Sequence, residues 1–574
     1  MTFPRNCNSR IVPLLCIYCI LWITIQKVNV YWMDSDIHLT VVTCGVAVVA
    51  VFMLILRRSE IQVSGVDTLV TFWFLYAMIR ACCDTTYPCG NFCLRAVQMF
   101  SLYLAVRLLF SSSIPAEWIL VSGILLCAGY EVILGACQIL SGTGRHHLYA
   151  LSGTFLNPGP YSAFLSMALV MSCQMRKKQL IILFAILLPA TWSRAAWLSS
   201  AICLGIIYWD KWKQWKWLVL AAGLLLAAGL YFLKKGSADG RLVIYIISLF
   251  SICRHPLFGS GISSFCHRYA EGMSAFSASH PDFDFRNADV TSSAFNSLLQ
   301  IGVEQGLVGV CLAVALITIL LLRLHRTGKV LCMGLLCLVL FSMFSYPFDL
   351  LPYQIIFVLI AAFAGTGHQI VKWSNSKIVK SSILASALLL SSFTYRHIKE
   401  RAQAEADYRM MAGVNHADFI RDYYEILPLM RANEHFLFDF GRILATAGRY
   451  NDSNSMLRMG TLVSNDPMFY VMQGNNCRDM GFYPEAEHAY RKAFHVMPNR
   501  LYPLYQLMLL YERQGDTERM ADMARQVIAF KEKVVSPATE EMKAKARERS
   551  LSPALPDPPL KGRVSKEGGA ERHL

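Results

Sequence analysis

Residues 234–296 read KKGSADGRLVIYIISLFSICRHPLFGSGISSFCHRYAEGMSAFSASHPDFDFRNADVTSSAFN, and they interrupt a chain that is otherwise strongly apolar over about its first 396 residues. Aqueous loops of this length are uncommon and usually functional. The stretch concentrates cationic and imidazole side chains, namely Arg241, Arg254, His255, His267, Arg268, His280 and Arg286. Such a set suits an anionic ligand, because guanidinium groups pair well with phosphate oxygens. We therefore expect a membrane protein in which this loop lies over a site for a lipid-borne anionic substrate.

The composition divides the chain into regions. Of the 574 residues, 55% are hydrophobic and 16% are charged, whereas a soluble protein of this size carries roughly a quarter charged residues. The deficit falls in residues 1–396, while residues 397–533 have an ordinary soluble composition and residues 534–574 are rich in Pro, Lys, Arg and Glu. We predict an all-α protein with a polytopic transmembrane bundle at 1–396, helical repeats at 397–533 and a disordered tail at 534–574.

About twenty apolar residues in a helix cross the hydrocarbon core of a membrane, and the chain offers about thirteen candidate runs. The predicted spans are 11–29, 38–56, 65–80, 93–110, 116–138, 159–174, 179–192, 194–209, 217–233, 297–322, 330–346, 352–371 and 379–395. The first run could instead belong to a signal peptide, but no small-residue cleavage site follows it. The prediction is therefore about 12–13 spans.

The distribution of charge predicts the orientation of these spans. Lys and Arg gather in alternate connections, near Arg57, Arg176, Lys211, Arg323 and Lys372. Such clusters mark the cytoplasmic side of a membrane protein. The long loop and the C-terminal repeats would then face away from the cytoplasm. The net charge of +15 follows from these clusters, and no recognition motif indicates nucleic acid as a partner.

The C-terminal region contains a repeat. Glycines recur at spacings of 33 and 34 residues, at Gly448, Gly481 and Gly515. The middle unit matches the tetratricopeptide pattern at Gly474, Ala486, Tyr490, Ala493 and Pro498. We predict about three helix-turn-helix repeats at 434–530, preceded by a helical pair at 398–433. They could bind a protein partner or act as a rigid packing module.

Four stretches predicted on the outer side carry the polar residues of the membrane domain. They are residues 153–160 (GTFLNPGP), residues 191–197 (TWSRAAW), residues 240–261 (GRLVIY, then HPLFGSG), and residues 295–309 (FNSLLQ, then Glu304, Gly306 and Gly309). In these stretches the sequence resembles the O-antigen ligase and O-antigen polymerase superfamily. That superfamily includes bacterial O-oligosaccharyltransferases, some of which carry C-terminal tetratricopeptide repeats. The resemblance covers about residues 150–350 by motif and the whole membrane domain by layout.

The resemblance implies a reaction and its partners. It implies transfer of a glycan from an undecaprenyl (polyprenyl) diphosphate carrier to an acceptor hydroxyl, at the periplasmic face of a bacterial inner membrane. The acceptor would be a glycan, a lipid A-core of lipopolysaccharide or a protein. Arg194 and Arg241 match the two arginines that the family uses, and we assign them to the diphosphate, whose departure needs fixed cations. No set of residues has the spacing of a metal site, and no cofactor is expected.

The catalytic base is the open point. Ligases of this family have a His immediately before the Asn of the fourth motif, and here that position is Phe295, followed by Asn296. We predict His280, Glu304 and Asn296 as catalytic residues, with Asp284 as a further substitute base. Weaker contacts to glycan or acceptor are predicted for Asn157, Tyr245 and His255. Each of these side chains could instead have a structural role, such as capping a helix or facing solvent.

Several alternatives remain open at this point. Ligase, polymerase and protein O-oligosaccharyltransferase differ in the acceptor, which the membrane domain does not reveal. A transporter or flippase of lipid-linked glycan would place Arg194 near the middle of the membrane, whereas a transferase would place it at the outer boundary. A membrane-anchored scaffold would leave the cationic loop unexplained. The cluster of cysteines from Cys82 to Cys93 could form a disulfide or remain as free thiols.

Overall fold

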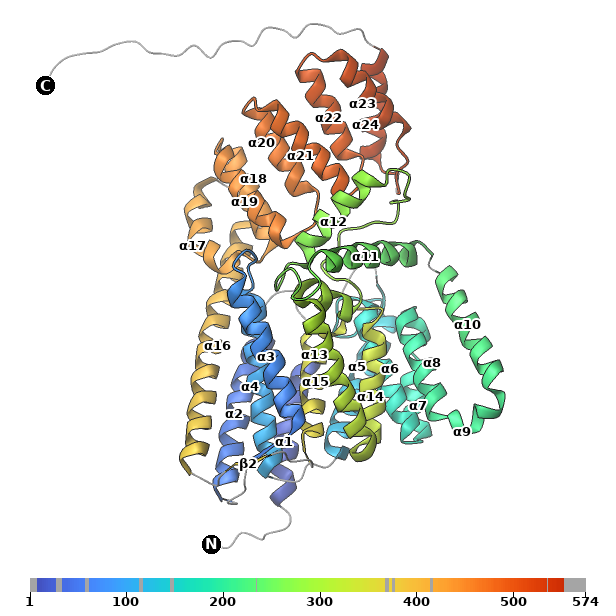
Figure 1. Ribbon diagram of the computed structural model, residues 1–574, viewed down its shortest axis with the longest axis vertical. Coiled ribbons are helices and arrows are strands. Elements are labelled where there is room, and N and C mark those ends of the chain that lie inside the picture. The colour runs from blue at the N-terminus through green and yellow to red at the C-terminus, as the bar shows by residue number, and fades with distance from the viewer. Residues whose placement is uncertain are drawn as a thin grey trace, which may run out of the picture.

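The computed structural model describes residues 8–26, 34–56, 61–112, 117–144, 149–233, 235–366, 371–373, 377–412, 417–533 and 535–551. These residues are almost entirely helical, as predicted. The strands among them are β1 (Ile61–Val63) and β2 (Val371–Trp373), which pair antiparallel. Figure 1 shows a bundle of long helices with a stack of shorter helix pairs on one end.

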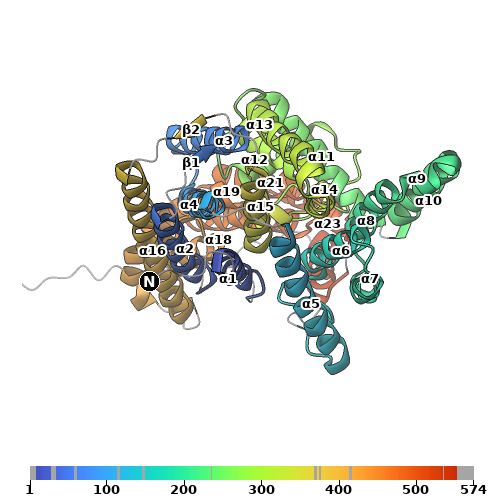
Figure 2. The ribbon, with the colours of Figure 1, turned by 90° about the horizontal axis from the view of Figure 1, so that it is seen from below.

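The first part of the bundle consists of α1 (Asn8–Thr24), α2 (Asp34–Leu56), α3 (Gly65–Cys83), α4 (Gly90–Ser112) and α5 (Glu117–Ser141). The second part consists of α6 (Pro158–Gln174), α7 (Lys178–Ala185), η1 (Pro189–Thr191), α8 (Arg194–Ile207), α9 (Trp209–Trp212), η2 (Lys213–Trp215) and α10 (Lys216–Leu233). Figure 2 shows α16 and α2 on one side of the bundle and α8 to α10 extending from the other.

The bundle is completed by α13 (Ser297–Thr327), α14 (Lys329–Ser342), η3 (Pro347–Asp349), α15 (Leu351–Ala364) and α16 (Lys377–Ala412). The core of the bundle lies around α6, whose side chains are all buried from Pro160 to Cys173. A helix that is apolar on every side belongs inside a packed bundle. Helix α6 packs against α5, α7, α8 and α14. Both of its ends are therefore fixed relative to these neighbours.

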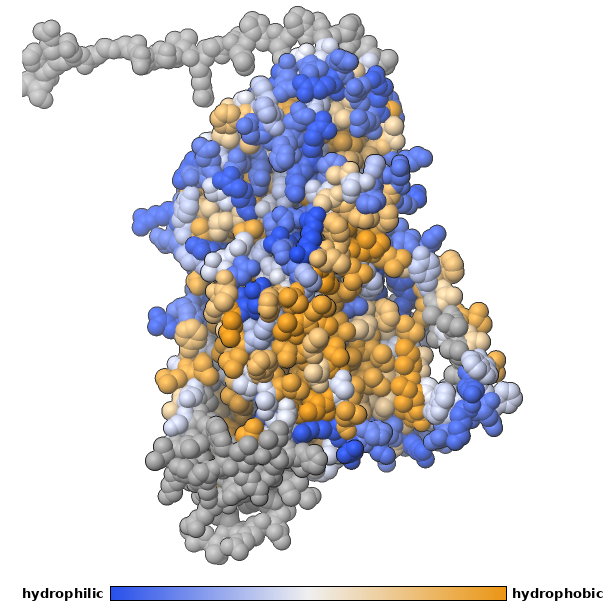
Figure 3. Space-filling view, viewed as in Figure 1, coloured by the Kyte–Doolittle hydropathy of each residue, from blue (hydrophilic) through white to orange (hydrophobic). Residues whose placement is uncertain are grey.

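Six helices of the described residues are long and apolar enough to cross a membrane: Ser35–Leu54, Gly65–Cys83, Gly90–Phe110, Glu117–Ser141, Lys235–Arg254 and Ser297–Thr327. The bent pair Trp209–Leu218 and Ala221–Leu233 would make a seventh. Five more of the predicted runs form apolar helices of only 10–17 residues, namely Ile11–Thr24, Lys178–Thr191, Arg194–Ile207, Lys329–Ser342 and Leu351–Ala364. Figure 3 shows the apolar belt around the bundle, with hydrophilic surface above it on the repeats.

Residues 235–296, expected to be a loop, contain two helices. They are α11 (Lys235–Arg254) and α12 (Phe265–Ser279). Although α11 is apolar enough to be a span, Figure 1 shows it lying across the end of the bundle, between α10 and the repeats. Its apolar side packs on α12 through Ile247, which is buried together with Tyr269. The segment therefore forms a helical cap on the bundle.

A break in α13 joins this cap to the bundle. The chain at Gly306 has φ 69° and ψ −168° and interrupts the helix. The freed backbone bonds to the stretch before α12: Leu307 N donates to the carbonyl of Pro256 (2.8 Å). A side chain at Gly306 would meet the backbone nitrogen of Gly259 at 2.4 Å. Glycine is therefore needed at Gly306 for two backbones to touch.

The C-terminal region consists of η4 (Ala417–Phe419), α17 (Ile420–Met430), α18 (Glu434–Thr446), α19 (Tyr450–Val463), α20 (Met468–Asp479), α21 (Tyr483–Val496), α22 (Tyr502–Arg513), α23 (Thr517–Ala529) and α24 (Pro537–Leu551). From α18 to α23 the helices pack in consecutive pairs. The repeated glycines follow the first helix of each pair with positive φ, at Gly448, Gly481 and Gly515. The predicted helix-turn-helix arrangement is thus present.

Two boundaries differ from the prediction. The boundary predicted after residue 396 falls inside α16, which runs beside α2 and continues without a break into the repeat region (Figure 1). Residues 537–551, predicted to be disordered, form α24, which packs on α23. Its Ala546 is fully buried and its Arg549 pairs with Glu512 at 2.6 Å. These contacts hold a helix that is too polar to be predicted from composition; residues 552–574 lie outside the described residues.

Candidate active site

Arg194 is the first residue of α8, at the end of the bundle capped by α11. The turn before it is tight, because Trp192 has a left-handed φ of 49° and Ser193 caps the helix. The guanidinium donates to the carbonyl of Leu230 (3.3 Å) at the end of α10 and to Ser237 Oγ (3.2 Å) on α11. Arg194 therefore lies at the boundary of the bundle and not at mid-depth. A boundary position favours transfer over transport.

Arg241 lies beside Arg194. It follows Ser237 by four residues on α11, so the two side chains share one face of the helix. Arg194 bonds Ser237 one turn before Arg241, and its charge acts on the Arg241 guanidinium, so the two cations are near enough to interact. Arg241 Cζ lies 5.1 Å from the centroid of the Phe295 ring. The Arg241 guanidinium makes no hydrogen bond and no ion pair with the residues that the structure describes. Its N–H donors are therefore available to an anion.

The other predicted polar residues surround Arg241. Tyr245, one turn further along α11, donates to the carbonyl of Phe295 (3.3 Å). Asn157 caps α6 and donates through Nδ2 to Tyr346 Oη (2.8 Å). The Tyr346 and Phe295 rings meet edge to face, with their centroids 5.4 Å apart. The motifs that are distant in sequence thus converge around one guanidinium.

Phe295 and Asn296 shape the chain where it enters α13. Phe295 has a left-handed φ of 49°, an unusual conformation for a bulky residue. Asn296 is the N-cap of α13, and its Oδ1 accepts from the backbone of Leu298 (3.0 Å) and Leu299 (3.1 Å). The predicted Asn296 therefore has a structural task at the site, since it satisfies N–H groups that a helix start leaves free.

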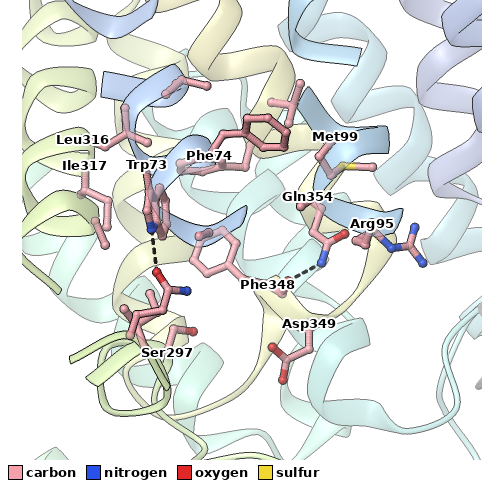
Figure 4. Close-up of a pocket in the computed structure, with 18 of the residues that line it drawn as sticks. Trp73, Phe74, Arg95, Met99, Ser297, Leu316, Ile317, Phe348, Asp349 and Gln354 are labelled. Atoms are coloured by element: carbon pink, nitrogen blue, oxygen red, sulfur yellow. Dashed lines mark hydrogen bonds between the residues drawn. The ribbon is translucent and has the colours of Figure 1, made fainter. Parts of the chain in front are cut away.

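A cavity of about 400 Å³ adjoins these residues between α3, α4, α13 and α15. Its wall is mostly apolar, but the carboxylates of Glu304 and Asp349 both line it. The backbone N–H groups of Ser263 and Phe265 hydrogen-bond the Glu304 carboxylate. Asp349, the last residue of the 3-10 turn η3 before α15, is one of the lining residues drawn in Figure 4. Its carboxylate makes no hydrogen bond and no ion pair within the described parts of the chain, whereas its backbone N–H donates to the carbonyl of Tyr346 (3.2 Å).

The surroundings of Asp349 change its chemistry. Enclosure by protein raises the pKa of Asp349 to about 7, because burial disfavours the charged carboxylate. The charges of Asp349 and Arg241 both act on the Tyr346 hydroxyl. Tyr346 therefore connects the cation pair to the carboxylate. A carboxylate that titrates near neutral pH beside a reaction centre is suited to general base catalysis.

The remaining predicted residues lie elsewhere. His280 ends α12, is exposed, and stacks on Phe276 of the same helix with ring centroids 4.3 Å apart. Asp284 is paired with Arg286 at 2.7 Å. His255 lies just beyond α11, about 20 Å from Arg241 along the helix axis at 1.5 Å per residue. Within the described residues, none of the three predicted side chains contacts Arg194 or Arg241.

The sequence analysis missed Ser237, Tyr346 and Asp349. Residues 346–349 read YPFD and lie at the short connection between two predicted apolar runs. An acidic residue in such a connection is costly unless it has a function, and this signal could have identified Asp349. Among the described residues, no group of three or more His, Cys, Asp or Glu side chains lies together as metal ligands would. The described cysteines are not bridged, and Cys89 Sγ and Cys93 Sγ lie 4.0 Å apart.

Comparison with known proteins gives one family. Residues 179–314 match the O-antigen ligase family. This range contains Arg194, Arg241 and Glu304 but ends before Tyr346. Among solved structures, the one titled "Crystal structure of MamA protein" is similar at 16% identity, with 26% of this chain and 88% of that chain covered and a TM-score of 0.22. No curated protein matches the chain.

Proposed function

We propose, from the O-antigen ligase domain that this multi-pass membrane protein carries at residues 179–314, that the chain transfers a glycan from a polyprenyl-diphosphate carrier to an acceptor hydroxyl. The domain identifies a membrane glycosyltransferase of the O-antigen ligase and polymerase type. The observation that carries the more specific proposal is the pair of guanidinium groups of Arg194 and Arg241. Two like charges held together are unfavourable until an anion lies between them.

The two arginines divide the work on the diphosphate. Arg194 is anchored by Leu230 and Ser237 and provides a fixed positive charge. Arg241 rests on the Phe295 ring and directs its free donors to the phosphate oxygens. Negative charge grows on the diphosphate as the bond from the sugar to its oxygen breaks. Fixed cations stabilise that charge more in the transition state than in the bound donor, and this difference accelerates the reaction.

Asp349 is the base in this proposal. The acceptor hydroxyl gives its proton to the Asp349 carboxylate, and its oxygen forms a bond to the anomeric carbon of the sugar. The bond from that carbon to the diphosphate oxygen breaks, and the polyprenyl diphosphate leaves with the electron pair. This assignment accounts for Phe295 at the position of the family's His, because the proton acceptor comes from the connection before α15 instead.

The arrangement of charge along the bundle supports a periplasmic site. The starts of α6, α8 and α13 meet at the site, so these helices end at the opposite face of the bundle. The connections at that face carry the clusters Arg176 to Lys178, Lys211 to Lys216, and Arg323 to Lys329. Such clusters are typical of cytoplasmic connections. The site and the repeats would then face the periplasm of a bacterial inner membrane.

The test is glycan transfer by the purified full chain in lipid nanodiscs. A polyprenyl-diphosphate-linked oligosaccharide is the donor, and a lipid A-core, an oligosaccharide and a hydroxyl-rich peptide are offered separately as acceptors. Arg241→Ala is expected to lower the rate at least about 100-fold, in line with the loss of one fixed transition-state donor. Arg254→Ala is the matched control, because Arg254 is on the same helix but rests on Phe250. Equal activity of Arg241→Ala and wild type would reject the proposal.

A further inference from the structure

The repeats and the cap on the bundle share one core. The cap helix α12 packs against α19 and α21, the second helices of two repeat pairs (Figure 1). Met497, at the end of α21, is fully buried in the same apolar cluster as Ile247 of α11 and Tyr269 of α12. Such packing fixes the relative position of its members. The repeat region is thus in direct contact with the segment that carries the candidate site.

Two asparagines of the repeats bind the backbone of this segment. Asn465, which follows α19 and is 1% exposed, accepts from the backbone N–H of Thr291 (3.1 Å) and donates to its carbonyl (2.5 Å). Asn499, which follows α21, donates to the carbonyl of Ala288 (2.6 Å). A buried amide that satisfies both polar groups of one residue fixes that residue strongly, because each group would be costly to leave unpaired.

A chain of hydrogen bonds continues from Thr291 to Phe295. Thr291 Oγ1 donates to the carbonyl of Ser293 (2.7 Å) and accepts from its N–H (3.3 Å). Ser293 Oγ accepts from the N–H of Phe295 (3.0 Å), and Gln300 Oε1 accepts from the N–H of Ala294 (3.3 Å). The backbone N–H groups of residues 291, 293, 294 and 295 are therefore all bound by side chains. This network ends at Phe295, whose ring supports the Arg241 guanidinium.

We propose that Asn465 is a positioning residue of the transferase and that the repeats complete its active site. This inference rests on the proposed function and names a further element of the same site. A left-handed conformation at a bulky residue persists only where the surroundings hold it. Asn465 provides that hold through Thr291 and Ser293, and the Phe295 ring then keeps the Arg241 guanidinium beside Arg194. Without Asn465, Phe295 relaxes and Arg241 loses its fixed position.

Hydrogen exchange tests the positional part without any assumption about the reaction. In the full chain in nanodiscs, Asn465→Ala is expected to accelerate exchange at residues 291–295 at least tenfold, while α20 to α23 keep their protection. Asn475→Ala is the matched control, because Asn475 accepts from Tyr490 within the repeats and has no contact with the segment among the described residues. Unchanged exchange at 291–295 in Asn465→Ala would overturn the inference.

Activity tests the catalytic part. Asn465→Ala and Thr291→Val are each expected to lower kcat at least tenfold, while Thr291→Ser, which keeps the hydroxyl, restores the wild-type value. Faster exchange with an unchanged kcat would overturn the positioning role. If the wild-type chain transfers no glycan to any acceptor, the proposed function fails. The exchange result alone then decides whether the repeats hold the segment.

Discussion

The two helices of the cap, α11 and α12, both carry cationic side chains but use them in opposite ways. On α12, Arg268 pairs with Glu271 at 2.8 Å, and His267 lies 3.3 Å from the same carboxylate. His267 also hydrogen-bonds the carbonyl of Thr461 on α19 at 2.8 Å. On α11, Arg241 has no such acid among the described residues and faces Arg194 instead. The number of cations therefore marks the region, and within it Arg268 is a paired cation, whereas Arg241 has no acidic partner among the described residues.

The same contrast holds for the acids of the two regions. The hydrogen bond from His267, followed by the interaction with Arg268, holds the pKa of Glu271 at about 2. Enclosure without a partner raises the pKa of Asp349 to about 7. Glu271 is therefore a permanent charge that pairs with His267 and Arg268 on its own helix α12. Asp349 can take up and release a proton under physiological conditions.

The largest expected effect follows from replacing each acid with its amide. Asp349→Asn is expected to lower the transfer rate by about 10²–10⁴-fold, the usual contribution of a general base. Glu271→Gln is expected to leave the rate within about twofold of wild type. Initial rates with lipid-linked donor and saturating acceptor provide the comparison. If the two variants lose activity equally, paired and unpaired acids do not differ in function.

The pH profile sharpens the contrast. Asp349 must be deprotonated to accept a proton, so the rate should rise with pH through about 7 and be roughly a hundredfold lower at pH 5 than on the plateau. Glu304, Tyr103 and Arg95 are the other ionisable groups that line the cavity, and Arg95 is already paired with Asp36. The profile of Glu271→Gln should keep the wild-type midpoint. A rate independent of pH between 5 and 9 would exclude Asp349 as the base.

The smallest expected effect concerns stability. Because the pKa of Glu271 is depressed, its carboxylate stabilises the folded chain at pH values above its ordinary pKa of 4.5. This contribution is lost as the pH falls toward about 2. The carboxylate is 36% exposed, and solvent screens the interaction, so Glu271→Gln should cost no more than about 1 kcal/mol at pH 7. Thermal unfolding in detergent measures the change. A loss several times larger would show that this pair holds the cap and repeats together.

Much of the architecture was predictable from local patterns. Apolar runs predicted the helices, and the recurring Gly448, Gly481 and Gly515 predicted the repeat turns, because these signals depend on neighbouring residues. The match of residues 179–314 to the O-antigen ligase family supports the predicted superfamily. Placing Arg194 and Arg241 at one site depended on the resemblance, and in the structure Arg194 bonds Ser237, one turn before Arg241 on α11. Their role on a diphosphate remains a proposal.

The features that the sequence did not predict depend on contacts between distant parts of the chain. Composition could not show that α11 lies across the bundle, since its apolar residues would equally suit a span. Asp349 lacked a recognisable motif, and its chemistry comes from the helices that enclose it. Asn465 lies 174 positions after Thr291, so no local pattern connects them. The polar helix α24 is stabilised by packing on α23, which sequence periodicity does not record.

The most direct test of the cation pair is the binding of a polyprenyl diphosphate that carries no glycan, measured by titration calorimetry on the full chain in nanodiscs. If Arg194 and Arg241 hold the diphosphate, Arg241→Ala should weaken binding at least tenfold, or by about 1.4 kcal/mol. Arg268→Ala, which removes a paired cation of α12, should leave the Kd within about twofold. Equal Kd values for wild type and Arg241→Ala, or an equal loss in both variants, would contradict the account.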